Sequence, residues 1–476
     1  MVGKAERRTD RPFTREKTEM KVIVCGAGRV GATIARYLAE DDNDVVLIDN
    51  DEERLIDLTS TMEVRPVVGF ASYPSVLERA NAQDADMLIA VTASDEVNMV
   101  TCQAANSLFR VPTKIARLRS NEYTNQKWRK FYTHDALPID VVISPEVEIA
   151  RSIRRNISFP GAFEVIPLAM DKVYLLGIHC DDVCPMINTP LRQLTELFPD
   201  VNAVVAALVR DSKLIITDSD TRILAGDDVY VIVPSDAVRR ILTLFGRDQE
   251  RAQSVLILGG NNIGLNLARY LERASHMRVT LIEEDEDRAR FLAETLSQTT
   301  VIHGDFLNTD LLEEADIDIV ETVIAVGSKD EDNILASLMA KRYGVEQTIS
   351  VIEKPLYSQL VVNLGIDVII DPKDIMVSTI LQHVRRGKIY AAYSIRSGLC
   401  EVLEADAFDT FEYTGTALRD VRLPMGVIIG AIVRDGEAVS LRGDTVIQSG
   451  DRLVLFTDAE SVKQVEKLFS VAPEVF

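Results

Sequence analysis

Three glycines near the start of the chain have the spacing of a dinucleotide-binding turn: Gly26, Gly28 and Gly31 lie in the stretch GAGRVG. An apolar run, residues 22–25, comes directly before them, and a helical pattern follows. In such a turn the first glycine allows a tight bend, the second lets a pyrophosphate approach the backbone, and the third lets the helix pack closely on its sheet. The N–H groups at the start of the helix then attract the phosphates. The stretch therefore predicts a nucleotide site rather than an ordinary glycine turn.

An acidic residue follows at the position that selects between the two nicotinamide cofactors. Asp49 closes the second apolar run, residues 45–48, about twenty residues beyond the glycines. A carboxylate there accepts hydrogen bonds from a pair of ribose hydroxyls and repels a 2′-phosphate. The pattern favours NAD over NADP.

Two more polar side chains come near the carboxyl ends of predicted strands. Thr92 follows the strand expected at 87–91, at the edge where open α/β sheets bind their ligands, and its hydroxyl and nearby backbone could reach a ribose or phosphate. Arg117 lies inside the apolar strand expected at 115–118. Because a buried cation is costly unless it is paired, we expect Arg117 to meet either a phosphate or a carboxylate such as Asp95.

The elements around these residues alternate between strands and helices as far as residue 156, which predicts a parallel, doubly wound sheet. Expected helices include 52–61 and 125–132. From Phe163 to Phe245 the composition changes to short β-rich pieces separated by turns and closed by a short helix. This stretch predicts a small α+β domain.

The same order then repeats. Gly259, Gly260 and Gly264 follow a second apolar strand, and Glu283 stands where the first half has Asp49. Asn261 replaces the middle glycine. Because Asn tolerates a left-handed backbone, we expect the turn to survive, while the Asn side chain crowds the pyrophosphate. The second site is expected to bind a nucleotide differently, weakly or not at all.

The fold class predicted is therefore α/β, with two Rossmann-type domains that are each followed by a small α+β domain. The expected segments are a disordered tail or start-site extension (1–19), a Rossmann domain (20–140), a crossover helix (141–157), a small domain (158–246), a second Rossmann domain (252–372), a second crossover helix (373–390) and a second small domain (391–476).

Composition excludes several kinds of partner. The net charge of −22 argues against a nucleic-acid surface and against direct binding to anionic lipid. No apolar run reaches the length of about 18–20 residues that a membrane helix needs. Five scattered cysteines form no disulfide framework, which fits the cytoplasm. No second ligand pair follows Cys180 and Cys184 at zinc-like spacing, so no metal site is expected.

No catalytic constellation is expected either. A dehydrogenase needs a general acid or base near the nicotinamide. Tyr123 and Lys127 match the Tyr-x-x-x-Lys spacing of short-chain dehydrogenases, but the match rests on two residues. An NAD-dependent oxidoreductase is kept as the alternative.

The duplicated order and the stretches GAGRVG, LIDND, AVTASDEVNM, IARLRS and PIDVVISPE closely resemble the RCK (KTN) regulatory family, the cytosolic NAD-binding subunits of Trk-type bacterial potassium uptake systems. The resemblance covers residues 20–476. It implies a nucleotide-sensing cytoplasmic subunit that gates a potassium-translocating integral membrane subunit. It also implies a homo-oligomer, a tetramer whose duplicated units form an eight-unit ring. A sensor subunit of a different membrane transporter is the second alternative.

The resemblance implies NAD(H) as cofactor, with ATP or ADP in some members, and it implies that the small domains mediate assembly or bind further effectors. It also assigns contacts. The nucleotide contacts that it implies are Gly26, Ala27, Gly28, Arg29, Val30, Gly31, Asp49, Thr92, Ala93 and Arg117 in the first half, and Gly259, Gly260, Gly264 and Glu283 in the second.

Overall fold

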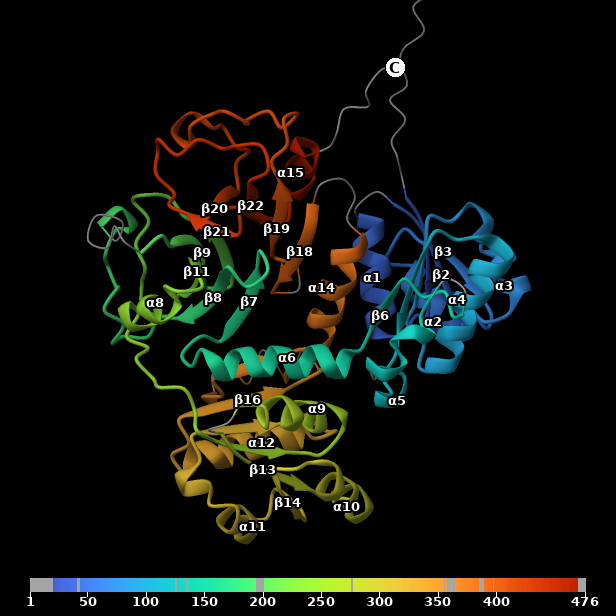
Figure 1. Cartoon of the computed structure of the whole chain (residues 1–476), viewed down its shortest axis with the longest axis horizontal. Helices are drawn as coiled ribbons and strands as arrows, with labels where there is room; N and C mark the ends of the chain where they lie inside the picture. Colours follow the sequence, from blue (N-terminus) through green and yellow to red (C-terminus); the bar gives the residue numbers. More distant parts are fainter. Residues whose placement is uncertain are drawn as a thin grey trace, which may run out of the picture. The chain divides into compact units, whose positions relative to one another are not determined.

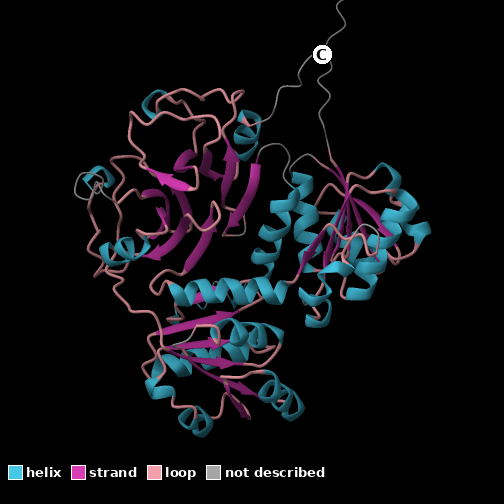
Figure 2. Cartoon of the chain, in the orientation of Figure 1, coloured by secondary structure: helices cyan, strands magenta, loops and turns pink. Residues whose placement is uncertain are grey.

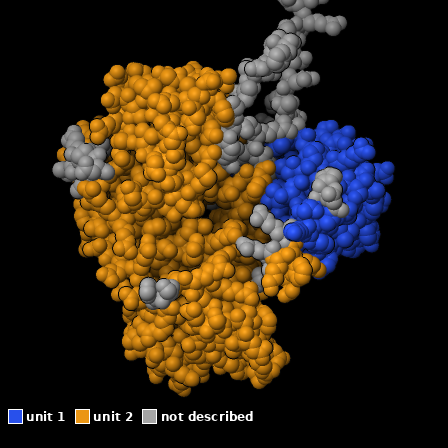
Figure 3. Space-filling model, in the orientation of Figure 1, with its two compact units in different colours: residues 1–117, 130–142 blue, residues 118–129, 143–476 orange. Residues whose placement is uncertain are grey.

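The computed structural model divides into two compact units, one formed by residues 1–117 and 130–142 and the other by residues 118–129 and 143–476 (Figure 3). The expected tail, 1–19, lies outside the described residues. The structure describes residues 20–469 apart from gaps at 41–42, 125, 134–135, 194–200, 275–276, 355, 358–360, 362–363, 385–388 and 397.

The first Rossmann domain is built on a six-stranded sheet in the order β3-β2-β1-β4-β5-β6 (Figure 1). The order reverses between β1 and β4, and at such a point a crevice opens at the carboxyl ends of the strands. The pairs that join β3, β2, β1, β4 and β5 are all parallel. The strands are β1 (Lys21–Cys25), β2 (Asp44–Asp49), β3 (Arg65–Val68), β4 (Met87–Ala90), β5 (Thr113–Arg117) and β6 (Val141–Ile143).

Local signals in the sequence set the helices of this domain. Helix α1 (Arg29–Glu40) buries Ile34, Ala35 and Leu38 on one face. The side chain of Asp51 caps α2 (Glu52–Thr59) by accepting from Arg54 N. The other helices are α3 (Pro74–Arg79), η1 (Ala82–Asp84) and α4 (Asp95–Phe109).

Three helix predictions need correction. Helix α2 ends at Thr59 rather than at residue 61, where the chain turns toward β3. The helix expected at 125–132 is a short α5 (Asn121–Thr124) followed by a 3-10 helix, η2 (Gln126–Phe131). The crossover helix expected at 141–157 starts later, because residues 141–143 form β6; it is α6 (Pro145–Ser158), which has a proline at its first position.

The first small domain is a five-stranded antiparallel sheet in the order β10-β9-β11-β8-β7. Helix α8 packs on one face of this sheet, and the core between them is apolar. Its elements are β7 (Glu164–Leu168), β8 (Val173–His179), β9 (Val204–Arg210), β10 (Lys213–Ile216), β11 (Asp228–Pro234) and α8 (Val238–Leu244).

The second half repeats both architectures, with the same strand order in each of its two sheets. Figure 2 distinguishes the helices and strands by colour. The predicted fold class is confirmed. The second Rossmann domain contains β12 (Ser254–Leu258), α9 (Asn262–Leu271), β13 (Arg278–Glu283), α10 (Glu286–Thr295), β14 (Thr300–His303), α11 (Thr309–Glu314), η3 (Ile317–Ile319), β15 (Thr322–Ala325), α12 (Asp330–Arg342), β16 (Gln347–Val351), β17 (Val368–Ile370) and the crossover helix α14 (Pro372–Val384). The second small domain contains β18 (Ile389–Ile395), β19 (Cys400–Asp406), η5 (Leu418–Asp420), β20 (Val427–Arg434), β21 (Glu437–Val439), β22 (Arg452–Asp458) and α15 (Val462–Leu468).

The two small domains share a hydrophobic core. Tyr230 on β11 and Phe456 on β22 are fully buried there, with ring centroids 6.3 Å apart. Arg396 of the second small domain donates from Nε to the Tyr230 hydroxyl at 2.9 Å. The two small sheets therefore form one packed body. None of the described helices combines the length and the apolar character that spanning a bilayer requires.

A repeated Gly-Asp pair in the sequence has a structural role in each small domain. The Asp227 carboxylate is fully buried and accepts two hydrogen bonds from Arg210, at 2.8 Å from Nε and 2.7 Å from Nη2. Arg434 donates to Asp451 in the same way, at 2.7 and 2.8 Å. Each bidentate pair fixes the turn before β11 or β22, because the same carboxylate also accepts a backbone N–H of that turn.

Candidate nucleotide site

The first glycine loop has the geometry that the sequence predicts. Gly26 has φ +106°, and a Cβ there would lie 3.0 Å from the backbone of Thr92. A Cβ on Gly31 would lie 1.8 Å from Gly26 O, so only glycine allows α1 to start this close to the loop. Gly28 differs from both, because a Cβ there would meet no atom within 4 Å. The backbone at Gly28 thus faces open space at the start of α1.

Asp49 lies at the end of β2 beside this loop and is 9% exposed. Its Oδ2 accepts from Ala27 N at 2.5 Å, and its Oδ1 accepts from Asp51 N at 2.9 Å. Arg54 Nη1 is 3.8 Å from Oδ1. The carboxylate therefore holds the glycine loop and lies at the switch-point edge of the sheet, where the acid of a dinucleotide site is placed.

Thr92 lies at the same edge, directly after β4, and its polar groups are used within the protein. Its N and Oγ1 both donate to Asn98 Oδ1, at 2.9 and 2.7 Å. Asn98 is fully buried and donates from Nδ2 to Arg117 O at 2.9 Å. The amide of Asn98 thus ties the end of β4 to the end of β5. Sequence reasoning gave Asn98 no role.

The repeat could have indicated the importance of Asn98, since Asn333 occupies the equivalent position in the second half. Asn333 Nδ2 donates to Gly327 O at 3.0 Å and to Val351 O at 2.9 Å. A buried polar side chain that recurs in register between two halves indicates a shared backbone-bridging role.

Arg117 is the last residue of β5 rather than an internal one. The pairing of β5 with β4 ends at Ala90 and Ala116, so Arg117 extends beyond the paired region to the carboxyl edge. Arg29 and Ala93 are exposed and Val30 is half-buried, and all three border the loop. The structure therefore brings all of the residues expected in the first site to one edge of one sheet.

The second glycine loop keeps the bend. Gly259 has φ +109°, and a Cβ on Gly264 would lie 2.1 Å from Gly259 O. Glu283 at the end of β13 accepts from Gly260 N at 2.5 Å and from Asp285 N at 2.9 Å. These contacts repeat those of Asp49, so Glu283 holds its loop as Asp49 does.

Asn261 makes the second loop different in kind. Its Oδ1 accepts from Ile263 N at 2.9 Å and from Gly264 N at 3.1 Å, while its Nδ2 donates to Val326 O. These two backbone donors are those that a pyrophosphate would use. The start of α9 is therefore already capped by the Asn261 side chain.

The turn at Asn261 survives, as expected, but a left-handed backbone is not the reason. The φ of Asn261 is −62°, which is extended rather than left-handed. The turn survives because the side chain caps α9, a position that Asn favours.

The two sites also differ in the side chains at two further positions. Gly327 and Val351 stand where the first half has Thr92 and Arg117, as the register of the sheet strands shows. Arg288 approaches the second loop instead, donating from Nε to Gly260 O at 2.7 Å. Its guanidinium carbon lies 5.1 Å from the centre of the Phe291 ring. A cation thus covers the second loop from the side of α10.

The described residues give no support to a metal site or to Tyr123 and Lys127 acting as a dehydrogenase pair. Among the residues that the structure describes, no three His, Cys, Asp or Glu side chains are grouped to hold a metal ion. Burial and the neighbouring Cys184 thiol raise the pKa of Cys180, which disfavours the thiolate that a metal needs. Tyr123 belongs to α5 and Lys127 to η2, so the two residues are not on one continuous helix.

Comparison with known families agrees with this architecture. The TrkA-N domain model matches residues 22–145 and 255–372, and the TrkA-C domain model matches residues 181–246 and 412–470. Over 458 residues the chain is 44% identical to the Trk system potassium uptake protein TrkA of Azorhizobium caulinodans, covering 96% of this chain and 100% of that protein. It is 40% identical over 461 residues to the protein of the same name from Halomonas elongata, covering 96% and 100%.

Solved structures show the same fold. A crystal structure of the GsuK RCK domain matches with a TM-score of 0.57 at 16% identity, covering 98% of both chains. The GsuK channel matches with a TM-score of 0.59 at 16% identity, covering 95% of this chain and 79% of that one. From the two domain models, each matched twice, and from relatives aligned over nearly their full length, we conclude that the chain belongs to the family of Trk system potassium uptake proteins TrkA.

Proposed function

We propose that this protein is a nucleotide-sensing regulatory subunit that acts on the cytoplasmic side of a potassium-translocating membrane protein. The observation that carries the proposal is the open backbone at Gly28, which lies at the switch point of the first sheet beside Asp49. Membership in the TrkA family supplies the physiological setting, because the relatives are named for potassium uptake.

The ligand proposed for the first site is NAD(H), with ATP or ADP as competing ligands. The start of α1 would bind the pyrophosphate and Asp49 would accept from the ribose hydroxyls. One solved structure of the fold, with a TM-score of 0.57, is of the GsuK channel bound to NAD. The residues proposed for this site are Gly26, Ala27, Gly28, Arg29, Val30, Gly31, Asp49, Thr92, Ala93 and Arg117.

For the second half we propose no equivalent pyrophosphate site. Gly259, Gly260, Gly264 and Glu283 keep the shape of the loop, but the amide of Asn261 already uses the two donors that a phosphate needs. A ligand would have to displace this amide and also the Arg288 side chain. The expected stoichiometry is therefore one NAD(H) per chain.

Regulation would follow from differential affinity. A nucleotide that binds one arrangement of the domains better than another shifts the population toward the first arrangement. The proposed assembly is a homo-oligomer, a tetramer whose eight Rossmann domains form a ring on the membrane subunit. The duplicated order of Rossmann and small domains supports it, since each chain then supplies two units of such a ring.

The proposal is tested by calorimetric titration of the full chain with NADH, NAD, ATP and ADP. Asp49→Ala is the test variant, and Glu283→Ala is the matched control, because both carboxylates hold their loops through the same pair of backbone contacts. Loss of two hydrogen bonds to a charged group, at about 1.5–3 kcal/mol each, is expected to weaken NADH binding at least hundredfold in Asp49→Ala. Glu283→Ala should leave the affinity unchanged.

Other outcomes point to other functions. Absence of nucleotide binding at millimolar concentration would make the first loop structural. Hydride transfer from NADH to small carbonyl compounds would support the oxidoreductase alternative. Co-purification with a membrane carrier that does not move potassium would assign the sensor to a different transporter.

A further inference from the structure

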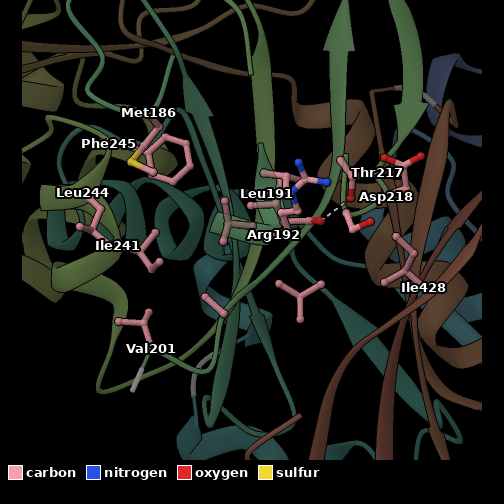
Figure 4. Close-up of a pocket in the computed structure, with 15 residues that line it drawn as sticks. Met186, Leu191, Arg192, Val201, Thr217, Asp218, Ile241, Leu244, Phe245 and Ile428 are labelled. Atoms are coloured by element: carbon pink, nitrogen blue, oxygen red, sulfur yellow. Dashed lines mark hydrogen bonds between the residues drawn. The ribbon is translucent and has the colours of Figure 1, made fainter. Parts of the chain in front are cut away.

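A cavity lies in the first small domain, and none of the residues that line it belongs to either glycine loop. Its volume is about 320 Å³, which is at the small end of the range of about 300–1,000 Å³ typical of ligand pockets. The β9–β11 face of the sheet and helix α8 form its main walls, and Ile428 on β20 of the second small domain completes it. Figure 4 shows Ile241, Leu244 and Phe245 on one side of the cavity and Thr217, Asp218 and Ile428 on the other.

Three of the polar side chains at the rim already have partners. Arg192 pairs with Asp220 at 2.5 Å, and Thr217 Oγ1 donates to Val205 O at 2.5 Å. Asp218 accepts from the Thr221 hydroxyl at 2.7 Å. A phosphate or another strongly charged ligand would have to break these contacts, and the rest of the described lining is almost entirely apolar. The cavity is therefore suited to an uncharged, mainly apolar molecule.

The second small domain shows what the same fold looks like when this space is filled. The isolated bridges Pro190–Arg222 and Ala417–Val446 and the ladders β9–β11 and β20–β22 place the two domains in register. At four positions in or beside the cavity the second domain carries a larger side chain that packs in its core. The replacements are Phe411 for Cys184, Tyr413 for Met186, Val427 for Ala203 and Ile429 for Val205.

These larger side chains form a packed cluster. The rings of Phe411 and Phe469 stack with centroids 4.6 Å apart, and Tyr413 meets Phe411 edge-on at 5.7 Å. In the first small domain Phe245 stands where Phe469 does, but Cys184 and Met186 face it in place of the two aromatic rings. A partly open cavity at the place where the second copy packs two aromatic rings indicates a space with a use.

We propose that the first small domain binds one small, uncharged, mainly apolar organic molecule in this cavity. Because Ile428 comes from the second small domain, the bound molecule contacts both small domains and stabilises their packed arrangement. The site is independent of the proposed nucleotide function, since it shares no residue with either glycine loop.

The test uses the full chain and the uncharged fluorescent probe N-phenyl-1-naphthylamine, whose emission rises in an apolar environment. The native protein is expected to bind the probe saturably with one site per chain. In the filled variant, Ala203→Val with Val205→Ile, the first domain receives two of the packed side chains of the second. This variant should bind the probe at least tenfold more weakly.

The matched control makes the opposite exchange in the second small domain: Val427→Ala with Ile429→Val. It should bind the probe as the native chain does, because it leaves the cavity unchanged. Ala203→Val alone is a milder second variant in case the double change impairs folding, and it should show an intermediate affinity. Circular dichroism spectra equal to that of the native chain would show that the small domains of all variants are folded.

Thermal unfolding gives a second measurement, in which the probe should raise the Tm of the native chain and the control but not that of the filled variant. No saturable binding by the native chain, or equal binding by the filled variant, would overturn the proposal.

Discussion

The sharpest prediction concerns the one residue that distinguishes the two glycine loops. Gly28→Asn places in the first loop the side chain that caps α9 in the second. The change is sterically free, because a Cβ on Gly28 meets no atom within 4 Å and the backbone there does not have a positive φ. Gly28 O accepts from Ala32 N at 2.8 Å, as Asn261 O accepts from Leu265 N at 2.9 Å. The new side chain is therefore expected to adopt the same cap.

The magnitude follows from the donors that this cap occupies. The N–H groups of Val30 and Gly31 would bond the new amide, as those of Ile263 and Gly264 bond Asn261. Each hydrogen bond that a pyrophosphate loses is worth about 1.5–3 kcal/mol, so two of them amount to at least about 3 kcal/mol. That corresponds to roughly hundredfold weaker NADH binding. The free energy of unfolding should change by only a few tenths of a kcal/mol, because Gly and Asn are both good caps.

The assay combines calorimetric titration with NADH and chemical denaturation of the same preparation. Gly28→Ala is the control: it adds a Cβ without an acceptor, so it should weaken binding much less than Gly28→Asn. Equal NADH affinity for Gly28→Asn and the native chain, at equal stability, would refute the reasoning and show that the helix start is not where the phosphates bind.

Two further predictions concern the small domains. Asp227→Asn should lower the free energy of unfolding by about 3 kcal/mol, because it breaks a buried bidentate pair with Arg210. Asp451→Asn should lower it by a similar amount, because it breaks the equivalent pair with Arg434. Native stability of both variants in chemical denaturation would contradict the structural role of these pairs. Burial and the Glu466 carboxylate raise the pKa of Glu401 to about 8, so the folded state holds a proton that the unfolded state releases above about pH 4.3. The free energy of unfolding should therefore fall as pH rises from about 4.3 to 8. Denaturation curves at pH 5, 6.5 and 8 should show a weaker pH dependence for Glu401→Gln than for the native chain. An equal pH dependence for both would contradict this role of Glu401.

Much of the fold could be predicted because its signals are local. The glycine loop, the acid at the end of β2 and the apolar strands follow from turn chemistry and side-chain periodicity within short windows. The repeat added a second copy of each signal. The errors fell where local signals are weak, as in residues 121–131, which form a short helix and a 3-10 helix in place of one longer helix.

The candidate site could be predicted only in part from the sequence. Residue types identified Gly28, Asp49 and Asn261 as important, but not that Asp49 also holds the glycine loop or that Asn261 caps α9. Asn98 went without a role because its partners are backbone atoms of two strands that are distant in sequence. Contacts of this kind exist only once the sheet has formed.

The duplicated order of domains and the sheet edge expected to bind a nucleotide both follow from short-range patterns in the sequence. That Asn261 caps α9 is visible only in the folded chain, because a helix cap depends on where the side chain points. The tertiary structure alone also revealed the cavity in the first small domain. Its space results from the sizes of side chains that converge from β9, β11, α8 and β20, and no single stretch of the chain contains that information.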